Sequence, residues 1–114
     1  MSKRDPRLYI EEILESIEKI KDYTKGMTLE VFSVDPKTVD AVVRNFEIIG
    51  EASRQLPDGV KEKYHEIKWK DLIDFRNVVI HEYFGINKKI MWDIIINELP
   101  PLEEKIRLRV DEQN

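Results

Sequence analysis

The 114 residues carry 19 basic and 23 acidic side chains, a net charge of −4, and no cysteine. This length is enough for one domain with a buried core, so we expect a single domain over residues 1–114. The lack of cysteine excludes disulfides and thiolate metal sites. The acidic balance argues against a protein that coats nucleic acid non-specifically. The N-terminus has no apolar signal block, and no apolar run is long enough to span a bilayer. We therefore expect a cytoplasmic protein that has no membrane partner.

Apolar residues recur at helical spacing through almost the whole chain. The first predicted helix begins at Asp5-Pro6, because Asp caps helices and Pro favours the first turn. It carries apolar residues from Ile10 to Ile20 and ends near Gly26. A short turn is expected over Thr28–Phe32 and a connector over Ser33–Pro36.

The second predicted helix runs from Pro36 to about Leu56, and Pro57-Asp58-Gly59 ends it. Gly50 in its interior indicates close approach by another helix. One face carries the charged residues Asp40, Arg44, Glu47, Glu51 and Arg54. The opposite face is an apolar stripe formed by Val39, Val42, Val43, Phe46, Ile49 and Leu56.

Three further helical segments complete the predicted fold. One short turn is expected over Val60–Tyr64, and a third helix over Lys70–Tyr83, with Gly85 just past its end. A fourth helix begins near Asn87 and is broken or kinked at Pro100-Pro101. No segment alternates in the manner of a strand. The pattern predicts an all-α protein, an antiparallel bundle of four to five helices.

The third predicted helix carries the residues best suited to chemistry. On a helical wheel, Arg76 lies inside a wide apolar arc, while Asn77 and His81 are i, i+4 neighbours on an adjacent polar stripe. A cation in an apolar arc needs a partner. Either a carboxylate of the second helix, Glu47 or Glu51, or the phosphate of a ligand could supply it.

His81 is one of only two histidines in the chain, and His65 is expected in a solvated loop. In the last turn of a helix the dipole favours the protonated imidazole, which suits a proton carrier, and Asn77 could orient the ring. An arginine that binds phosphate, together with such a histidine, is the minimum set of side chains needed to cleave RNA without a metal ion. The alternatives are that His81 is an ordinary solvated residue and that Tyr83 only packs in the core.

Other classes of site have little support in the sequence. Residues 61–89 form the only locally basic segment, with 7 basic and 5 acidic side chains, but this excess is small. No histidine and carboxylate spacing indicates a metal site, and no glycine-rich loop or nucleophile motif is present. Trp69 and Trp92 are expected in the core. We expect no cofactor and no metal.

The motif Arg76-Asn77-x-x-x-His81-x-Tyr83 resembles the Arg-x4-His-x-Tyr signature of HEPN-domain proteins, in particular the HepT-like toxins. A second block, Arg44-Asn45-Phe46-Glu47-Ile48-Ile49-Gly50-Glu51-Ala52, is also similar to that family. Trp69, Trp92-Asp93-Ile94-Ile95 and Leu99-Pro100 fit as well, so the resemblance covers essentially the whole chain.

This resemblance implies a HEPN-like helical bundle that forms a homodimer through the motif helix. It implies a metal-independent endoribonuclease, the toxin of a toxin–antitoxin pair, which acts on RNA and commonly on tRNA. Arg76 would hold the scissile phosphate, His81 would do acid–base work and Asn77 would support the site. The partner would be a nucleotidyltransferase antitoxin that transfers AMP to Tyr83. Cleavage needs both a base and an acid, and a dimer supplies two copies of His81.

Two other functions remain compatible with the sequence. The chain could be a catalytically silent HEPN subunit that binds nucleotide or substrate for a partner nucleotidyltransferase. The intact motif argues against this role, whereas the acidic net charge favours it, because an RNA enzyme gains affinity from cations. The chain could also be a helical interaction protein in which Arg76 merely pairs with Glu51.

Overall fold

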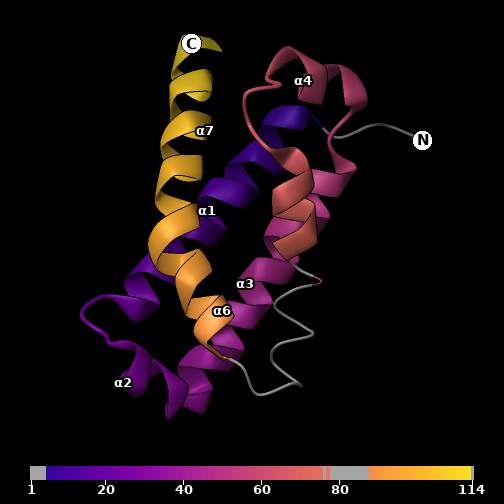
Figure 1. Cartoon of the computed structure of the whole chain (residues 1–114). Coiled ribbons are helices and arrows are strands. Elements are labelled where there is room, and N and C mark those ends of the chain that lie inside the picture. Colours follow the sequence, from indigo (N-terminus) through magenta and orange to yellow (C-terminus); the bar gives the residue numbers. More distant parts are fainter. Residues whose placement is uncertain (1–4, 76, 78–87, 114) are drawn as a thin grey trace.

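The computed structural model describes residues 5–75, 77 and 88–113, with the side chains of residues 110–113 left out. The molecule measures 41 × 27 × 21 Å. All regular secondary structure in these ranges is helical, and the long helices α1, α3 and α7 form the body of the bundle (Figure 1). The predicted all-α class is therefore confirmed.

Helix α1 (Pro6–Thr24) begins where the sequence predicts. The Asp5 carboxylate accepts a hydrogen bond from the backbone N–H of Arg7 at 2.9 Å, which satisfies one of the free donors of the first turn. The helix ends two residues before Gly26, whose φ of +77° lies in the left-handed region that glycine adopts without strain.

The segment predicted as a turn over Thr28–Phe32 is instead a short helix, α2 (Leu29–Ser33). The hydroxyl of Thr28 accepts a hydrogen bond from the backbone N–H of Val31 at 3.2 Å and so caps this helix. Phe32 is fully buried. The burial of this ring and the threonine cap explain why the segment is helical.

Helix α3 (Pro36–Gln55) matches the predicted second helix and is capped by Asp35, which accepts from the N–H of Thr38 at 3.1 Å. It packs lengthwise against α1, and Figure 1 shows the two running side by side. Gly50 is buried on α3, as a contact face requires. Every member of the predicted apolar stripe is buried: Val39, Val42, Val43, Phe46, Ile49 and Leu56.

Helix α4 (Asp58–Lys63) begins two residues before the predicted turn at Val60, with Pro57 at its N-cap. Pro57 therefore separates two helices, and Asp58 and Gly59 belong to the second of them. Residues 69–75 and 77 are helical and form the described part of the predicted third helix. The remainder of that helix, up to Tyr83, lies outside the described residues.

The last part of the chain is helical without interruption from α6 (Lys88–Asp93) through the π-helix η1 (Ile94–Glu98) to α7 (Leu99–Gln113). The backbone N–H of Leu99 donates to the carbonyl of Ile94, an i→i+5 bond. Pro100 and Pro101 have no N–H for the usual i→i+4 bonds to the preceding turn. The predicted break is therefore a π-helical turn, and the chain stays helical through both prolines.

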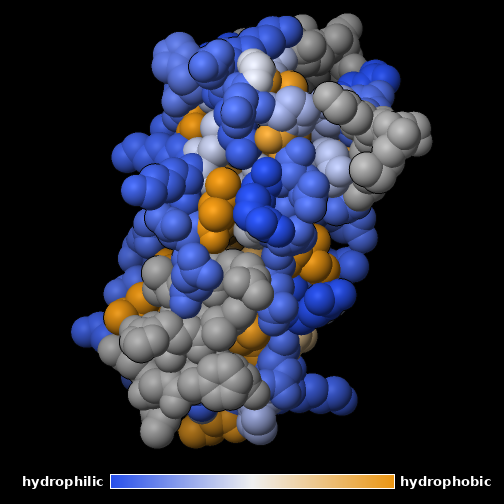
Figure 2. Space-filling view, turned by 90° about the vertical axis from the view of Figure 1, so that its right-hand side faces the viewer, coloured by the Kyte–Doolittle hydropathy of each residue, from blue (hydrophilic) through white to orange (hydrophobic). Residues whose placement is uncertain are grey.

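The core gathers the apolar faces of all these helices. Ile13, Ile17 and Ile20 of α1 are fully buried, while Ile10 is half-buried against the core. In the described ranges no helix is both long and apolar enough to span a membrane. The face in Figure 2 is mostly hydrophilic, with apolar side chains exposed only in small separate areas.

Candidate ribonuclease site

Four residues were predicted to form the site, and the structure describes one of them. Asn77 is helical and exposed. Arg76, His81 and Tyr83 lie outside the described residues, so their predicted roles stay predictions. The described part of the site therefore consists of residues 69–75, which lead into the motif, and of helix α3, against which Phe75 packs.

The residues just before the motif pack in the core of the bundle. Leu72 and Phe75 are buried, and the ring of Phe75 meets that of Phe46 on α3 edge-on, with centroids 5.9 Å apart and an interplanar angle of 78°. This is the favoured geometry for an aromatic pair. At the start of the segment, the indole N–H of Trp69 donates to the carbonyl of Tyr64 at 3.2 Å. Both ends of the segment 69–75 are thereby held against the bundle.

The two faces of this segment differ as predicted from the helical wheel. Leu72 and Phe75 point into the core, Ile73 and Asp74 are half-buried, and Asn77 is exposed. Of the predicted polar stripe of Asp74, Asn77 and His81, Asn77 is exposed and Asp74 is half-buried, while His81 lies outside the described residues. The Asn77 side chain is open to a ligand or to a second protein.

Glu47 and Glu51, the predicted partners of Arg76, line an open groove of about 470 Å³ between α1 and α3. Glu47 is half-buried and Glu51 is exposed. The Glu51 carboxylate accepts from Arg54 and from Gln55, each at 2.9 Å. Glu51 is therefore already stabilised from within α3, and whether it also meets Arg76 stays a prediction.

The remaining aromatic and imidazole side chains lie largely where the sequence places them. Trp69 is buried as predicted. Trp92 is half-buried and packs on Phe32, with ring centroids 5.2 Å apart. His65 is exposed, as expected of a loop residue. Within the described ranges, no group of three or more His, Cys, Asp and Glu side chains could hold a metal ion.

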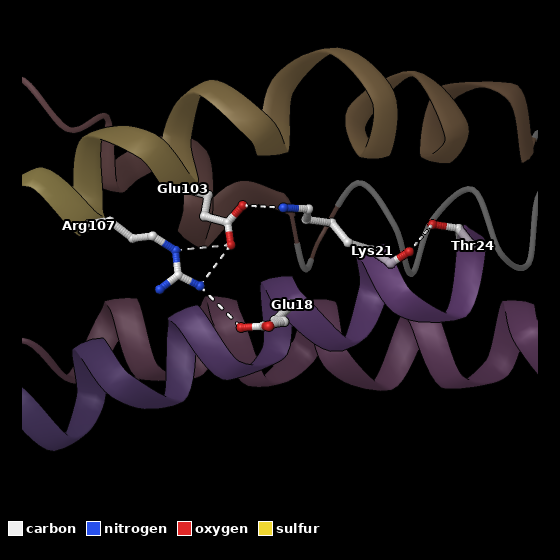
Figure 3. Close-up of polar contacts among 5 residues, drawn as sticks. All are labelled: Glu18, Lys21, Thr24, Glu103 and Arg107. Carbon is white, nitrogen blue, oxygen red and sulfur yellow. Dashed lines mark hydrogen bonds and ion pairs between the residues drawn. The ribbon is translucent and has the colours of Figure 1, made fainter. Parts of the chain in front are cut away.

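One group of polar residues was not anticipated from the sequence. Glu103 on α7 is 6% exposed and accepts from Lys21 at 2.7 Å and from Arg107 at 3.0 Å, and Arg107 also pairs with Glu18 (Figure 3). Burial by itself raises the pKa of Glu103, but hydrogen bonds from the two cations outweigh it and hold the pKa below its ordinary value. The i, i+4 spacing of Glu103 and Arg107 was the only signal in the sequence. These contacts tie α7 to α1, so their role is structural.

A second unanticipated contact lies next to the motif region. The ammonium of Lys88 at the start of α6 donates to the carbonyl of Ser33 at 3.0 Å. It ties the first residue of α6 to the end of α2. Phe75 before the motif and Lys88 after it are therefore both held by contacts with the bundle.

Comparison with known proteins identifies the family of this chain. Residues 13–108 match the family described as "Ribonuclease HepT-like". The chain belongs to the HepT-like ribonuclease family. The resemblance drawn from the motif residues is thus confirmed, and the family supports ribonuclease activity for this chain.

The relatives of this HepT-like chain include proteins of similar length. The "Putative RNase MJ0127" of Methanocaldococcus jannaschii is 45% identical over 100 residues, which are 88% of this chain and 83% of the relative. The "Putative RNase TTE0752" of Caldanaerobacter subterraneus is 41% identical over 91% of this chain and 93% of the relative. The "Probable ribonuclease HepT" of Thermococcus cleftensis is 39% identical over 90% and 94%. No solved structure gives a significant match.

Proposed function

We propose that this chain is a metal-independent endoribonuclease, the toxin of a HEPN and nucleotidyltransferase toxin–antitoxin pair. It cleaves cellular RNA in the cytoplasm, with tRNA as the candidate target. The observation that carries the proposal is the complete Arg76, Asn77, His81 and Tyr83 signature in a chain that belongs to the HepT-like ribonuclease family.

The reaction is an attack by the ribose 2′-oxygen on the neighbouring phosphorus. A bond forms between these two atoms, the bond from phosphorus to the 5′-oxygen breaks, and a 2′,3′-cyclic phosphate remains. A base must take the 2′-hydroxyl proton and an acid must protonate the departing oxygen. His65 is exposed in a loop beside α4, which leaves His81 as the one suitable histidine in each chain.

A homodimer through the motif helix supplies the second histidine. His81 of one copy acts as the base and His81 of the other copy as the acid, while the two Arg76 guanidiniums stabilise the charge that builds on the phosphate oxygens. The exposure of Asn77 supports this arrangement, since a second copy can approach this motif residue from outside the bundle.

The same geometry explains how a partner would silence the enzyme. A nucleotidyltransferase antitoxin transfers AMP from ATP to the Tyr83 hydroxyl. A bond forms between the phenol oxygen and the α-phosphorus, the α–β phosphoanhydride bond breaks, and pyrophosphate leaves. The adduct places bulk and negative charge two residues from His81. It repels the substrate phosphate and competes for Arg76.

The test is cleavage of RNA by the purified chain in the presence of a metal chelator. Cleavage is expected in the parent protein. Its rate should be at least a hundredfold lower in the Arg76→Ala and His81→Ala variants. His65→Ala is the matched control, because it removes the other histidine from an exposed position. Full activity of His81→Ala would contradict the proposal.

The second candidate is the catalytically silent HEPN subunit that binds nucleotide or substrate for its nucleotidyltransferase. The net charge of −4 favours it. Expression of the chain alone in a bacterial host distinguishes the two. Growth arrest that Arg76→Ala relieves supports the toxin, whereas normal growth with stable, soluble protein supports the silent subunit.

A further inference from the structure

The outer face of α3 carries charged side chains at helical spacing along most of its length. Four of them are exposed and Glu47 is half-buried; the set is Asp40, Arg44, Glu47, Glu51 and Arg54. Beside this stripe lies the open groove of about 470 Å³ between α1 and α3, which the half-buried Ile48 helps to line. We call the stripe and the groove together the α3 face.

Arg44 is the one cation among the described residues that line the groove. Asp40 lies four residues before it and Glu47 three residues after it, spacings at which opposite charges commonly pair on a helix. The Arg44 side chain nevertheless forms no hydrogen bond or ion pair with these or any other described residues. An exposed guanidinium that is surrounded by carboxylates but bound to none of them is available to a second molecule.

Glu51 follows Arg44 by two helical turns on the same face of α3. Arg54 and Gln55 donate to its carboxylate, each at 2.9 Å, yet 50% of the Glu51 side chain remains exposed. A carboxylate accepts from several donors at once, so these contacts do not exclude a further cation. Within one chain Arg44 does not reach Glu51, because two turns separate them by about 10 Å along the helix.

The charges of the α3 face are complementary to those of a second, antiparallel copy of α3. Arg44 precedes Ile48 by four residues and Glu51 follows it by three. A two-fold axis at Ile48 therefore places the Arg44 of each copy opposite the Glu51 of the other. The same axis places Asp40, eight residues before Ile48, close to Arg54, six residues after it. Two ion pairs of each kind form across the axis.

At the axis itself the contact is apolar. A residue on a two-fold axis meets its own copy, so the two Ile48 side chains pack on each other, with the groove leaving room for them. An apolar centre with charges around it is the usual arrangement of a protein interface. The two Glu47 carboxylates also approach each other near the axis, and the two Arg44 guanidiniums, one turn away, offset their repulsion.

We infer that a second copy of this chain docks on the α3 face, with the two α3 helices antiparallel about a two-fold axis at Ile48. The inference rests on the homodimer of the proposed function and adds α3 to its interface. Phe75 packs on Phe46 of this helix. An interface along α3 therefore lies on the helix that also supports the segment leading into the motif.

The test reverses charges and measures association by sedimentation over a range of concentrations. Arg44→Glu and Glu51→Arg each bring like charges together twice across the axis, so each variant alone should dimerise at least tenfold more weakly than the parent. An equimolar mixture of the two variants should associate about as tightly as the parent, because every charge in the mixed dimer again meets its opposite. A single chain that carries both substitutions should recover in the same way.

The matched controls are Lys25→Glu and Glu30→Arg. They reverse charges of the same kinds at exposed positions near α2, away from the α3 face. Both control variants should dimerise as the parent does. Because association is measured without RNA, none of these results depends on catalysis.

A cross-link at the axis tests the geometry without changing a charge. The chain has no cysteine, so Ile48→Cys introduces a single thiol that meets its own copy. We expect mild oxidation to give a covalent dimer, since the axis brings the two thiols within bonding reach. Val34→Cys, at a residue that is 79% exposed beyond α2, is the control and should cross-link at least tenfold more slowly.

A parent chain that stays monomeric overturns the inference. So does a mixture of folded Arg44→Glu and Glu51→Arg that associates no better than either variant alone. If one of these variants does not fold, the rate at which Ile48→Cys cross-links decides.

The interface and the proposed function can fail separately. A dimer that cleaves RNA but is unaffected by both charge reversals overturns the α3 interface and leaves the ribonuclease in place. An intact α3 interface in a chain in which His81→Ala has no effect on RNA cleavage supports the inference and contradicts the proposed function alone.

Discussion

Phe75 meets Phe46 edge-on, with ring centroids 5.9 Å apart, in the core between α3 and the segment that leads into the motif. Phe75 immediately precedes Arg76, and Phe46 immediately precedes Glu47. One aromatic contact therefore fixes the beginning of the motif relative to the helix that carries its predicted acidic partners. Substitutions that disturb this contact should lower both the free energy of unfolding and the rate of RNA cleavage.

The first prediction concerns Phe75→Leu. The substitution keeps an apolar side chain but removes the aromatic edge, so we expect a loss of about 1–2 kcal/mol in the free energy of unfolding. We also expect RNA cleavage to fall at least tenfold, since small displacements of catalytic groups are costly. Urea unfolding and initial cleavage rates measure the two effects. Val31→Leu, on an exposed residue of α2, is the control and should change neither.

The second prediction uses the buried carboxylate of Glu103. Its pKa is below the ordinary value of 4.5, so the charged form is favoured by folding. That stability is present above pH 4.5 and is lost as the pH falls through the lowered pKa. Glu103→Gln should cost about 1–3 kcal/mol at pH 7, and the difference from the parent should shrink below pH 4.5. A Glu103→Gln variant as stable as the parent at pH 7 would show that the ion pairs do not contribute.

The third prediction pairs two glycines that have open space around them. An added Cβ meets no atom within 4 Å at Gly26 or at Gly59, so packing does not distinguish the two sites. Gly26 has a φ of +77°, whereas Gly59 lies inside helix α4. Gly26→Ala should destabilise the protein by about 1 kcal/mol, and Gly59→Ala should stabilise it by about 0.5–1 kcal/mol. Thermal unfolding of both variants gives the signs, and equal signs would refute the backbone explanation.

The fourth prediction concerns Ser53, whose hydroxyl is fully buried and has no hydrogen-bond partner among the described residues. Burying an unpaired hydroxyl costs free energy that a methyl group does not. Ser53→Ala should therefore raise the free energy of unfolding by about 1 kcal/mol without altering RNA cleavage. Thr24→Val on α1 serves as the comparison, because the buried hydroxyl of Thr24 donates to the carbonyl of Ile20 at 2.7 Å. A destabilised Ser53→Ala variant would mean that the hydroxyl is used.

Helix boundaries were predicted well where a local signal exists. Asp5-Pro6 and Pro36 mark true helix starts, and Gly26 follows the end of α1. These signals are local because capping and φ restriction act within one turn of chain. The short helix α2 and the early start of α4 were missed. Helix α2 depends on the Thr28 cap and on the buried ring of Phe32, whereas α4 starts after Pro57 without a side-chain cap and buries no residue completely. Periodicity reveals neither helix over five or six residues.

The sequence by itself determined the all-helical class, the family and the identity of the motif residues. These follow from the spacing of apolar residues and from the order of residue types, both of which are properties of the chain. Only the tertiary structure decided which distant residues meet. The contact of Phe46 with Phe75, the ion pairs of Glu103 with α1 and the cavity that joins Ile10 to Ile106 are examples. The physical reason is that helical periodicity fixes which side of a helix is buried but leaves open which neighbour covers it.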